Sequence, residues 1–98
     1  MDIEDWRKKI DIIDDEILRL LNKRAQFTIE IGHIKNQKQL PIHSPEREES
    51  IIKRIVNENS GPLGGDGVRR VFERIIDESR KLEKDVLKNV STTNPKKE

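Results

Sequence analysis

Two cations interrupt an otherwise apolar helical stripe in the first third of the sequence. In the segment NKRAQFTIEIGHIK, residues 22–35, Arg24 stands where the spacing of its apolar neighbours calls for another hydrophobic side chain. Lys35 follows eleven residues later, which at 100° per residue returns to within about 20° of the same helix face. Since guanidinium and ammonium groups bind carboxylates and phosphates, the pair is suited to one wall of an anion site.

Further polar residues occupy inward positions of the two later helical segments. Arg47 and Glu48 each come four residues before an isoleucine, and Ser79 takes an apolar position, with Glu83 one turn later on the same side. Each residue has a structural explanation by itself. A long basic side chain can bury its stem and keep its head in water, edge positions can be solvated, and the serine can bond back to the preceding turn.

Together these residues indicate a polar interior with an excess of positive charge. Buried cations cost several kcal/mol each unless something anionic completes the set. The sequence therefore predicts a pocket for a small ligand that carries more than one carboxylate or phosphate.

The overall composition excludes several other classes of function. Twenty basic and nineteen acidic residues are mixed along the 98-residue chain and give a net charge of +1, so no long-range field favours nucleic acid or an anionic membrane. There is no cysteine, and His33 and His43 lack metal-ligand spacing, so we expect no metal. No apolar run exceeds two residues, which predicts no membrane segment and favours the cytoplasm.

The apolar spacing predicts an all-α protein of three helices. The first runs from about Asp5 to Gln39 and is roughly 50 Å long at 1.5 Å per residue. That length exceeds the dimensions of a compact monomer of this size, so the helix needs a partner along most of its length. Ser44 followed by Pro45 predicts the start of a second helix, to about Asn57.

A glycine-rich turn separates the second helix from the third. The stretch GPLGGDG lacks the lysine and hydroxyl residue of a phosphate loop, so we interpret it as a turn. Asp66 is expected to cap the third helix, whose apolar stripe runs from Val68 to Val86. We assign residues 1–90 to one domain and residues 91–98 to a polar C-terminal tail or linker.

Arg7 gives a geometric clue to assembly. It comes seventeen residues before Arg24, hence about 25 Å away along the helix axis. The two cannot share a site within one subunit. In an antiparallel dimer of the long helices, however, Arg7 would enter the partner's pocket.

The sequence resembles the all-helical chorismate mutases. The resemblance covers about Asp5 to Val86 and rests on WRKKIDIIDDEILRLLNKRAQFTIEIGHIK, PIHSPERE and VFERIIDESRKLE, which occur in the family's order and at its spacing. It implies an intertwined homodimer with two active sites, each receiving one arginine from the other subunit. The implied reaction is the Claisen rearrangement of chorismate to prephenate, which needs neither a nucleophile nor a cofactor.

The resemblance also implies roles for the polar residues. Arg24 and the partner's Arg7 would pair with the two carboxylates of the substrate, with Ser79 assisting one of them. Lys35 would contact a carboxylate and donate to the ether oxygen, while Glu83 would donate to that oxygen from the other side.

The ring hydroxyl and the cavity wall involve the second helix. Glu48 and the backbone near Ser44 would hold the hydroxyl, and Arg47 would shape and charge the wall. Ser44 departs from the aspartate frequent in the family, but both are good N-caps. Glu83 replaces a common glutamine, and a carboxyl donates a hydrogen bond only when protonated, so we expect activity to favour acidic pH.

Two alternatives stay open at this point. One is an enzyme on the same scaffold that eliminates pyruvate from isochorismate, a related anion. The other is a non-catalytic helical dimerisation or regulatory module. The sequence is equally compatible with a free-standing enzyme and with one part of a fused enzyme of aromatic biosynthesis.

Overall fold

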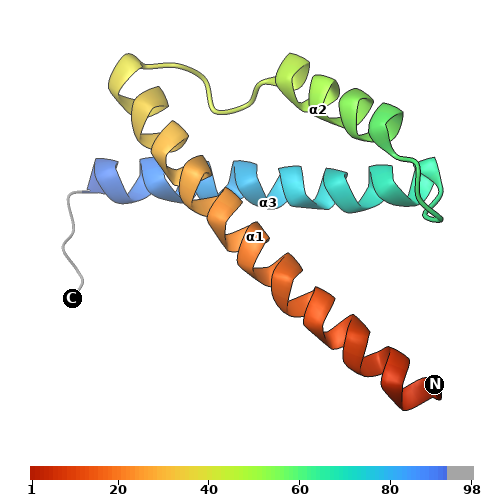
Figure 1. Cartoon of the computed structure of the whole chain (residues 1–98). Helices are drawn as coiled ribbons and strands as arrows, with labels where there is room; N and C mark the ends of the chain where they lie inside the picture. The colour runs from red at the N-terminus through yellow and green to blue at the C-terminus, as the bar shows by residue number, and fades with distance from the viewer. Residues whose placement is uncertain (93–98) are drawn as a thin grey trace.

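Three helices make up the described part of the chain in the computed structural model, which covers residues 1–92. In chain order they are α1 (Ile3–Lys38), α2 (Pro45–Glu58) and α3 (Gly65–Thr92). No strand occurs within this range, so the all-α prediction is confirmed. Figure 1 shows α2 running alongside α3, while α1 crosses α3 obliquely and its N-terminal half extends away from the other two helices.

The ends of α1 have local causes in the sequence. Asp2 and Asp5 form a reciprocal capping box, in which each side chain accepts a backbone N–H of the other, at 3.0 and 3.2 Å. The helix therefore starts two residues before the expected Asp5. It ends where Gln39 adopts a left-handed conformation, with a φ of 57°, and donates its N–H to the last turn.

At the starts of α2 and α3, the expected side-chain caps are not formed. Ser44 is the N-cap of α2 and Pro45 is its first residue, as predicted, but the Ser44 side chain makes no capping hydrogen bond. Asp66 does not cap α3, because the helix already begins at Gly65 and the carbonyl of Gly64 accepts the N–H of Val68 at 3.0 Å. Asp66 lies in the first turn, where its charge interacts favourably with the helix dipole.

The C-terminal end of α3 overlaps the expected tail. Helical backbone continues through Thr92, so the first two residues of the segment 91–98 belong to α3. The rest of that segment lies outside the described residues, and its assignment as a tail or linker stays a prediction.

A small apolar core joins α2 to α3. Ile51 and Ile52 of α2 are buried against Ile76 of α3, and Phe72 packs at the edge of this cluster. The crossing of α1 with α3 is built differently, around Gly32. A Cβ added to Gly32 would lie 3.5 Å from both the Glu83 Cα and the Val86 Cβ. These are ordinary van der Waals distances, so α1 passes next to the backbone of α3 at Gly32 with room for no more than a small side chain.

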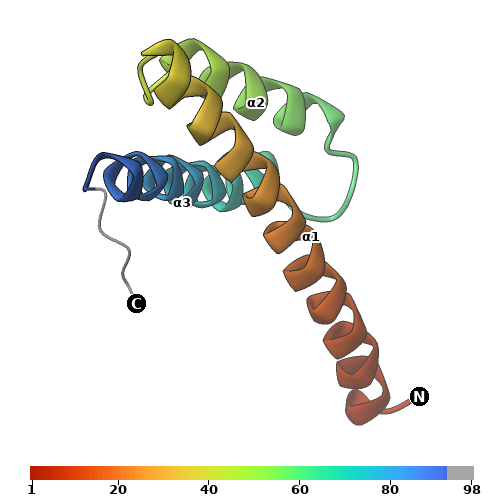
Figure 2. The ribbon, with the colours of Figure 1, turned by 90° about the vertical axis from the view of Figure 1, so that its left-hand side faces the viewer.

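No other described residue range covers the N-terminal half of α1. Five apolar side chains on this half are between 48% and 58% exposed, namely Trp6, Ile10, Ile13, Ile17 and Leu20. The chain measures 55 × 35 × 15 Å along its principal axes, and Figure 2 shows this half of α1 projecting away from α2 and α3. Within the described residues this half of α1 therefore lacks a packing partner, and the expectation that a second chain covers it stays a prediction.

Candidate active site

A cavity of about 290 Å³ lies between the C-terminal half of α1, the start of α2 and the middle of α3. Seven of the eight predicted site residues line it, contributed by all three helices and by the loop before α2. They are Arg24, Lys35, Ser44, Arg47, Glu48, Ser79 and Glu83. The eighth, Arg7, lies in the uncovered half of α1, where it pairs with Glu4 at 3.6 Å and its side chain is 68% exposed.

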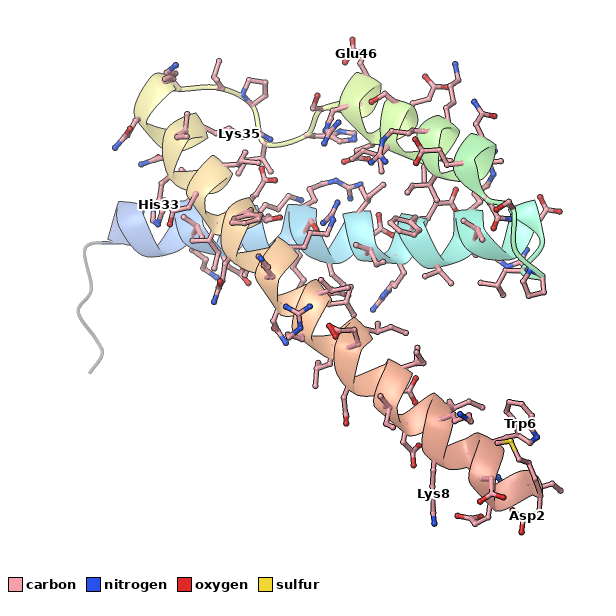
Figure 3. All side chains as sticks on the ribbon, in the orientation of Figure 1. Asp2, Trp6, Lys8, His33, Lys35 and Glu46 are labelled. Atoms are coloured by element: carbon pink, nitrogen blue, oxygen red, sulfur yellow. The ribbon has the colours of Figure 1, made fainter. Side chains whose placement is uncertain are left out.

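Lys35 and Glu83 form an ion pair in the cavity. The Lys35 Nζ donates to the Glu83 Oε1 at 2.7 Å and to the carbonyl oxygen of Ile42 at 2.9 Å. The two side chains are only 18% and 12% exposed. The pair follows from the helix crossing, because Lys35 lies one turn after Gly32, the residue that contacts the backbone of α3 at Glu83. Figure 3 shows Lys35 near the end of α1, remote from Trp6 at its start.

Arg24 reaches α3 through Ser79. An Arg24 guanidinium nitrogen donates to the Ser79 hydroxyl, which in turn donates to the carbonyl oxygen of Ile75 at 2.9 Å. Ser79 thus makes both the structural hydrogen bond to the preceding turn and a contact to Arg24 inside the cavity. Burial lowers the pKa of Arg24 from its ordinary value, the neighbouring Arg47 lowers it further, and Glu83 opposes both effects.

Glu48 is held by an arginine that the sequence did not single out. The Arg80 Nε and Nη2 donate to the two Glu48 oxygens at 3.0 and 2.8 Å, a bidentate pair. This hydrogen bonding lowers the pKa of Glu48 below its ordinary value of 4.5, against the opposing effect of burial; the charges of Arg80, His43 and Lys35 also lower it. Glu48 therefore accepts hydrogen bonds as an anion at neutral pH.

Three polar groups in or near the lining were missed, for different reasons. Thr28 is buried and lies four residues after Arg24, so the helical spacing contained the signal. Ile42 takes part through its backbone carbonyl, which depends on the path of the loop. Arg80 pairs with a residue 32 positions away, and no periodicity links two such positions.

The charges lining the cavity do not balance. Four cations and two carboxylates line it. Each carboxylate pairs with one cation, Glu83 with Lys35 and Glu48 with Arg80. Among the described residues, Arg24 and Arg47 have no carboxylate in ion-pair contact, and the charge of Arg47 destabilises the charged form of Arg24. The cavity as a whole thus suits an anion with two negative charges.

Two other classes of feature are missing from the part of the chain that the structure describes. Within residues 1–92, no group of three or more His, Cys, Asp or Glu side chains is placed to hold a metal ion. Over that range, no helix is long and apolar enough to cross a membrane.

The described part of the chain is thus a small all-helical domain with a cavity between its three helices, in which two cations have no carboxylate partner. The chain matches the family model described as chorismate mutase type II over residues 6–84. It therefore belongs to the chorismate mutase type II family, as the resemblance predicted.

Curated relatives fall into two size classes. The chain is 42% identical, over 87% of its length, to a bifunctional chorismate mutase/prephenate dehydratase of Aquifex aeolicus, but covers only 25% of that protein. It is 36% identical to a chorismate mutase of Methanocaldococcus jannaschii, with 92% of each chain covered. The chain thus spans about a quarter of the bifunctional relative and nearly the whole of the Methanocaldococcus chorismate mutase.

Solved structures show the same arrangement of helices. A chorismate mutase from Thermus thermophilus aligns with a TM-score of 0.82 and 36% identity, covering 84% of this chain and 93% of that one. A chorismate mutase from Helicobacter pylori, solved in complex with prephenate, aligns with a TM-score of 0.80 and 32% identity, covering 88% and 93%.

Proposed function

We propose that the chain is a chorismate mutase, an isomerase that converts chorismate to prephenate in the cavity between its helices. The observation that carries the proposal is the convergence of seven polar side chains on one cavity with an excess of two positive charges. Chorismate carries two carboxylates and so matches that excess. A relative with the same fold has been solved with prephenate, and the biosynthetic reaction suits a cytoplasmic enzyme.

The arrangement supports catalysis by positioning and by electrostatics. Arg24, together with the Ser79 hydroxyl, would bind one carboxylate and hold the enolpyruvyl side chain over the ring, which lowers the entropic part of the barrier. Lys35 and Glu83, now 2.7 Å apart, would separate around the ether oxygen. Lys35 would then donate a hydrogen bond to it as the C–O bond breaks, and Glu83 would do the same in its protonated form, stabilising the charge that develops in the transition state.

The remaining lining residues have supporting roles in this proposal. Glu48 would accept a hydrogen bond from the ring hydroxyl beside the backbone near Ser44. Arg47, which is exposed at the cavity edge, would add positive charge to the wall.

We further propose that the enzyme is an intertwined homodimer in which Arg7 acts in the partner's site. The uncovered apolar half of α1 supports this assembly. A second hollow, of about 430 Å³, lies on the other side of Arg24 and Ser79 and includes Leu21, Ile75 and Leu82 among its lining residues. A partner helix seated there would bring its own Arg7 next to Arg24.

The first prediction concerns the reaction itself. Incubation with chorismate should yield prephenate, and Arg24→Ala should lower kcat/KM about a hundredfold or more, since it removes a charge-assisted contact to a carboxylate. Arg70→Ala, an exposed position of α3 outside the cavity lining, is the control and should keep wild-type activity.

Product analysis separates this proposal from its alternatives. Release of pyruvate from isochorismate, with no prephenate formed from chorismate, would identify the lyase. Consumption of neither compound would identify a non-catalytic module.

The second prediction concerns pH. Glu83 faces Lys35 and Arg24, and only its protonated carboxyl can donate to the ether oxygen. We therefore expect kcat/KM to be higher at acidic pH than at neutral pH, and Glu83→Gln should flatten the profile, because an amide donates at any pH. A flat wild-type profile that Glu83→Gln leaves unchanged would refute a donor role for this carboxyl.

The third prediction tests whether Arg7 acts in trans. Arg7→Ala and Arg24→Ala homodimers should each be nearly inactive. After unfolding and refolding together at equal amounts, they should regain about a quarter of wild-type activity, since half of the dimers are mixed and each mixed dimer has one intact site of two. If both arginines act within one subunit, no mixed dimer contains an intact site and no activity returns.

A further inference from the structure

The carboxylate of Glu48 lies between two hollows of the molecule. On one side is the cavity that contains Lys35 and Glu83. On the other is a hollow of about 720 Å³ between α2 and α3, whose lining includes the cations Lys53 and Arg69 and also the carboxylates Glu49, Glu73 and Asp77. Either hollow offers cations to a carboxylate, so the direction of the Glu48 side chain requires a cause.

Arg80 supplies that cause. Its guanidinium lines the first cavity and not the second, and it contacts both oxygens of Glu48, at 3.0 and 2.8 Å. A two-point contact fixes the plane of a carboxylate as well as its position. The competing contact is longer, since the His43 Nε2 lies 3.7 Å from the Glu48 Oε1.

Arg80 is itself fixed in place. The Asp77 carboxylate, one turn earlier on α3, accepts from the Arg80 Nη2 at 3.2 Å, and the Arg80 side chain is 27% exposed. Arg80 also follows Ser79 directly on α3. The crossing of α3 with its neighbours thus places both the contact to Arg24 and the contact to Glu48.

We propose that Arg80 is a positioning residue, which holds the Glu48 carboxylate toward the substrate cavity so that it can accept the ring hydroxyl of the substrate. This inference rests on the proposed function for the role of Glu48. Each Glu48 oxygen has two lone pairs, and Arg80 occupies one on each. The carboxylate therefore keeps acceptor capacity for the ligand while its orientation is held.

Steady-state kinetics test the proposal with a double-mutant cycle. Arg80→Ala should lower kcat/KM about tenfold, mainly by raising KM, because the hydroxyl loses an oriented acceptor. In a Glu48→Ala background, the same substitution should change kcat/KM less than about twofold, since nothing is left to orient. An equal loss in both backgrounds would show that Arg80 contacts the substrate independently and would overturn the proposal.

Two further variants separate orientation from charge and from general destabilisation. Arg80→Lys keeps the charge but not the two-point contact, so it should recover only part of the lost kcat/KM. Full recovery with lysine would show that charge alone suffices and would contradict the orienting role. Arg54→Ala is the matched control, because it removes an arginine from an exposed ion pair with Glu58 on α2, at 3.5 Å, and should leave kcat/KM unchanged.

A carboxyl titration followed by carbon NMR reads the Arg80–Glu48 contact without activity. The groups that face Glu48 are Arg80 and, through their charges, His43 and Lys35. Because the contact lowers the pKa of Glu48, Arg80→Ala should make Glu48 titrate at higher pH than in wild type, and Arg80→Lys should lie between them. Identical titrations in wild type and Arg80→Ala would overturn the proposal.

The kinetics and the carboxyl titration test different parts of the proposal. If wild-type protein fails to convert chorismate, the proposed function is wrong and the hydroxyl-positioning role falls with it. The titration still decides whether Arg80 holds Glu48.

Discussion

An imbalance of charge inside a small cavity is the constraint on which the rest of the molecule depends. Lys35 forms an ion pair with Glu83, and Arg80 forms one with Glu48, so these four charges are balanced across the helices. Arg24 is partly buried and donates only to a neutral hydroxyl, with the charge of Arg47 nearby. Such an arrangement costs stability in the empty protein, and a dianionic ligand offsets that cost. Under the proposed function, the site would select its ligand by the charge that the fold leaves unsatisfied.

The helices pack around this cavity, and one chain does not enclose all of their apolar surface. The close crossing at Gly32 brings Lys35 to Glu83, and the buried isoleucines between α2 and α3 hold Glu48 near Arg80. The other half of α1 leaves apolar residues such as Trp6 and Ile13 more than half exposed. Within the proposed dimer, the same surface would bury these residues and deliver Arg7, so that assembly and catalysis depend on one helix.

Sequence reasoning predicted much of what depends on helical period and on local start signals. The eleven-residue spacing of Arg24 and Lys35 indicated one helix face, and both residues line the cavity. The Ser44–Pro45 signal indicated the start of α2, which begins at Pro45. Sequence reasoning missed features that depend on the packing of separate segments, such as the Arg80–Glu48 pair. It also missed backbone detail: the carbonyl of Gly64, and not the side chain of Asp66, accepts the hydrogen bond at the start of α3. Arg7 belongs to neither group, because its proposed site requires a second chain.

The most direct test of the central claim is the thermal stability of the protein at increasing concentrations of prephenate. A ligand that binds only the folded state raises Tm as its concentration rises above its Kd. Wild type should show a rising Tm with prephenate, and neither benzoate, which carries one carboxylate, nor the Arg24→Ala variant with prephenate should reproduce that rise at equal concentration. Equal stabilisation by benzoate and prephenate, or none by prephenate at saturating millimolar concentration, would contradict the account of a cavity built for a dianion.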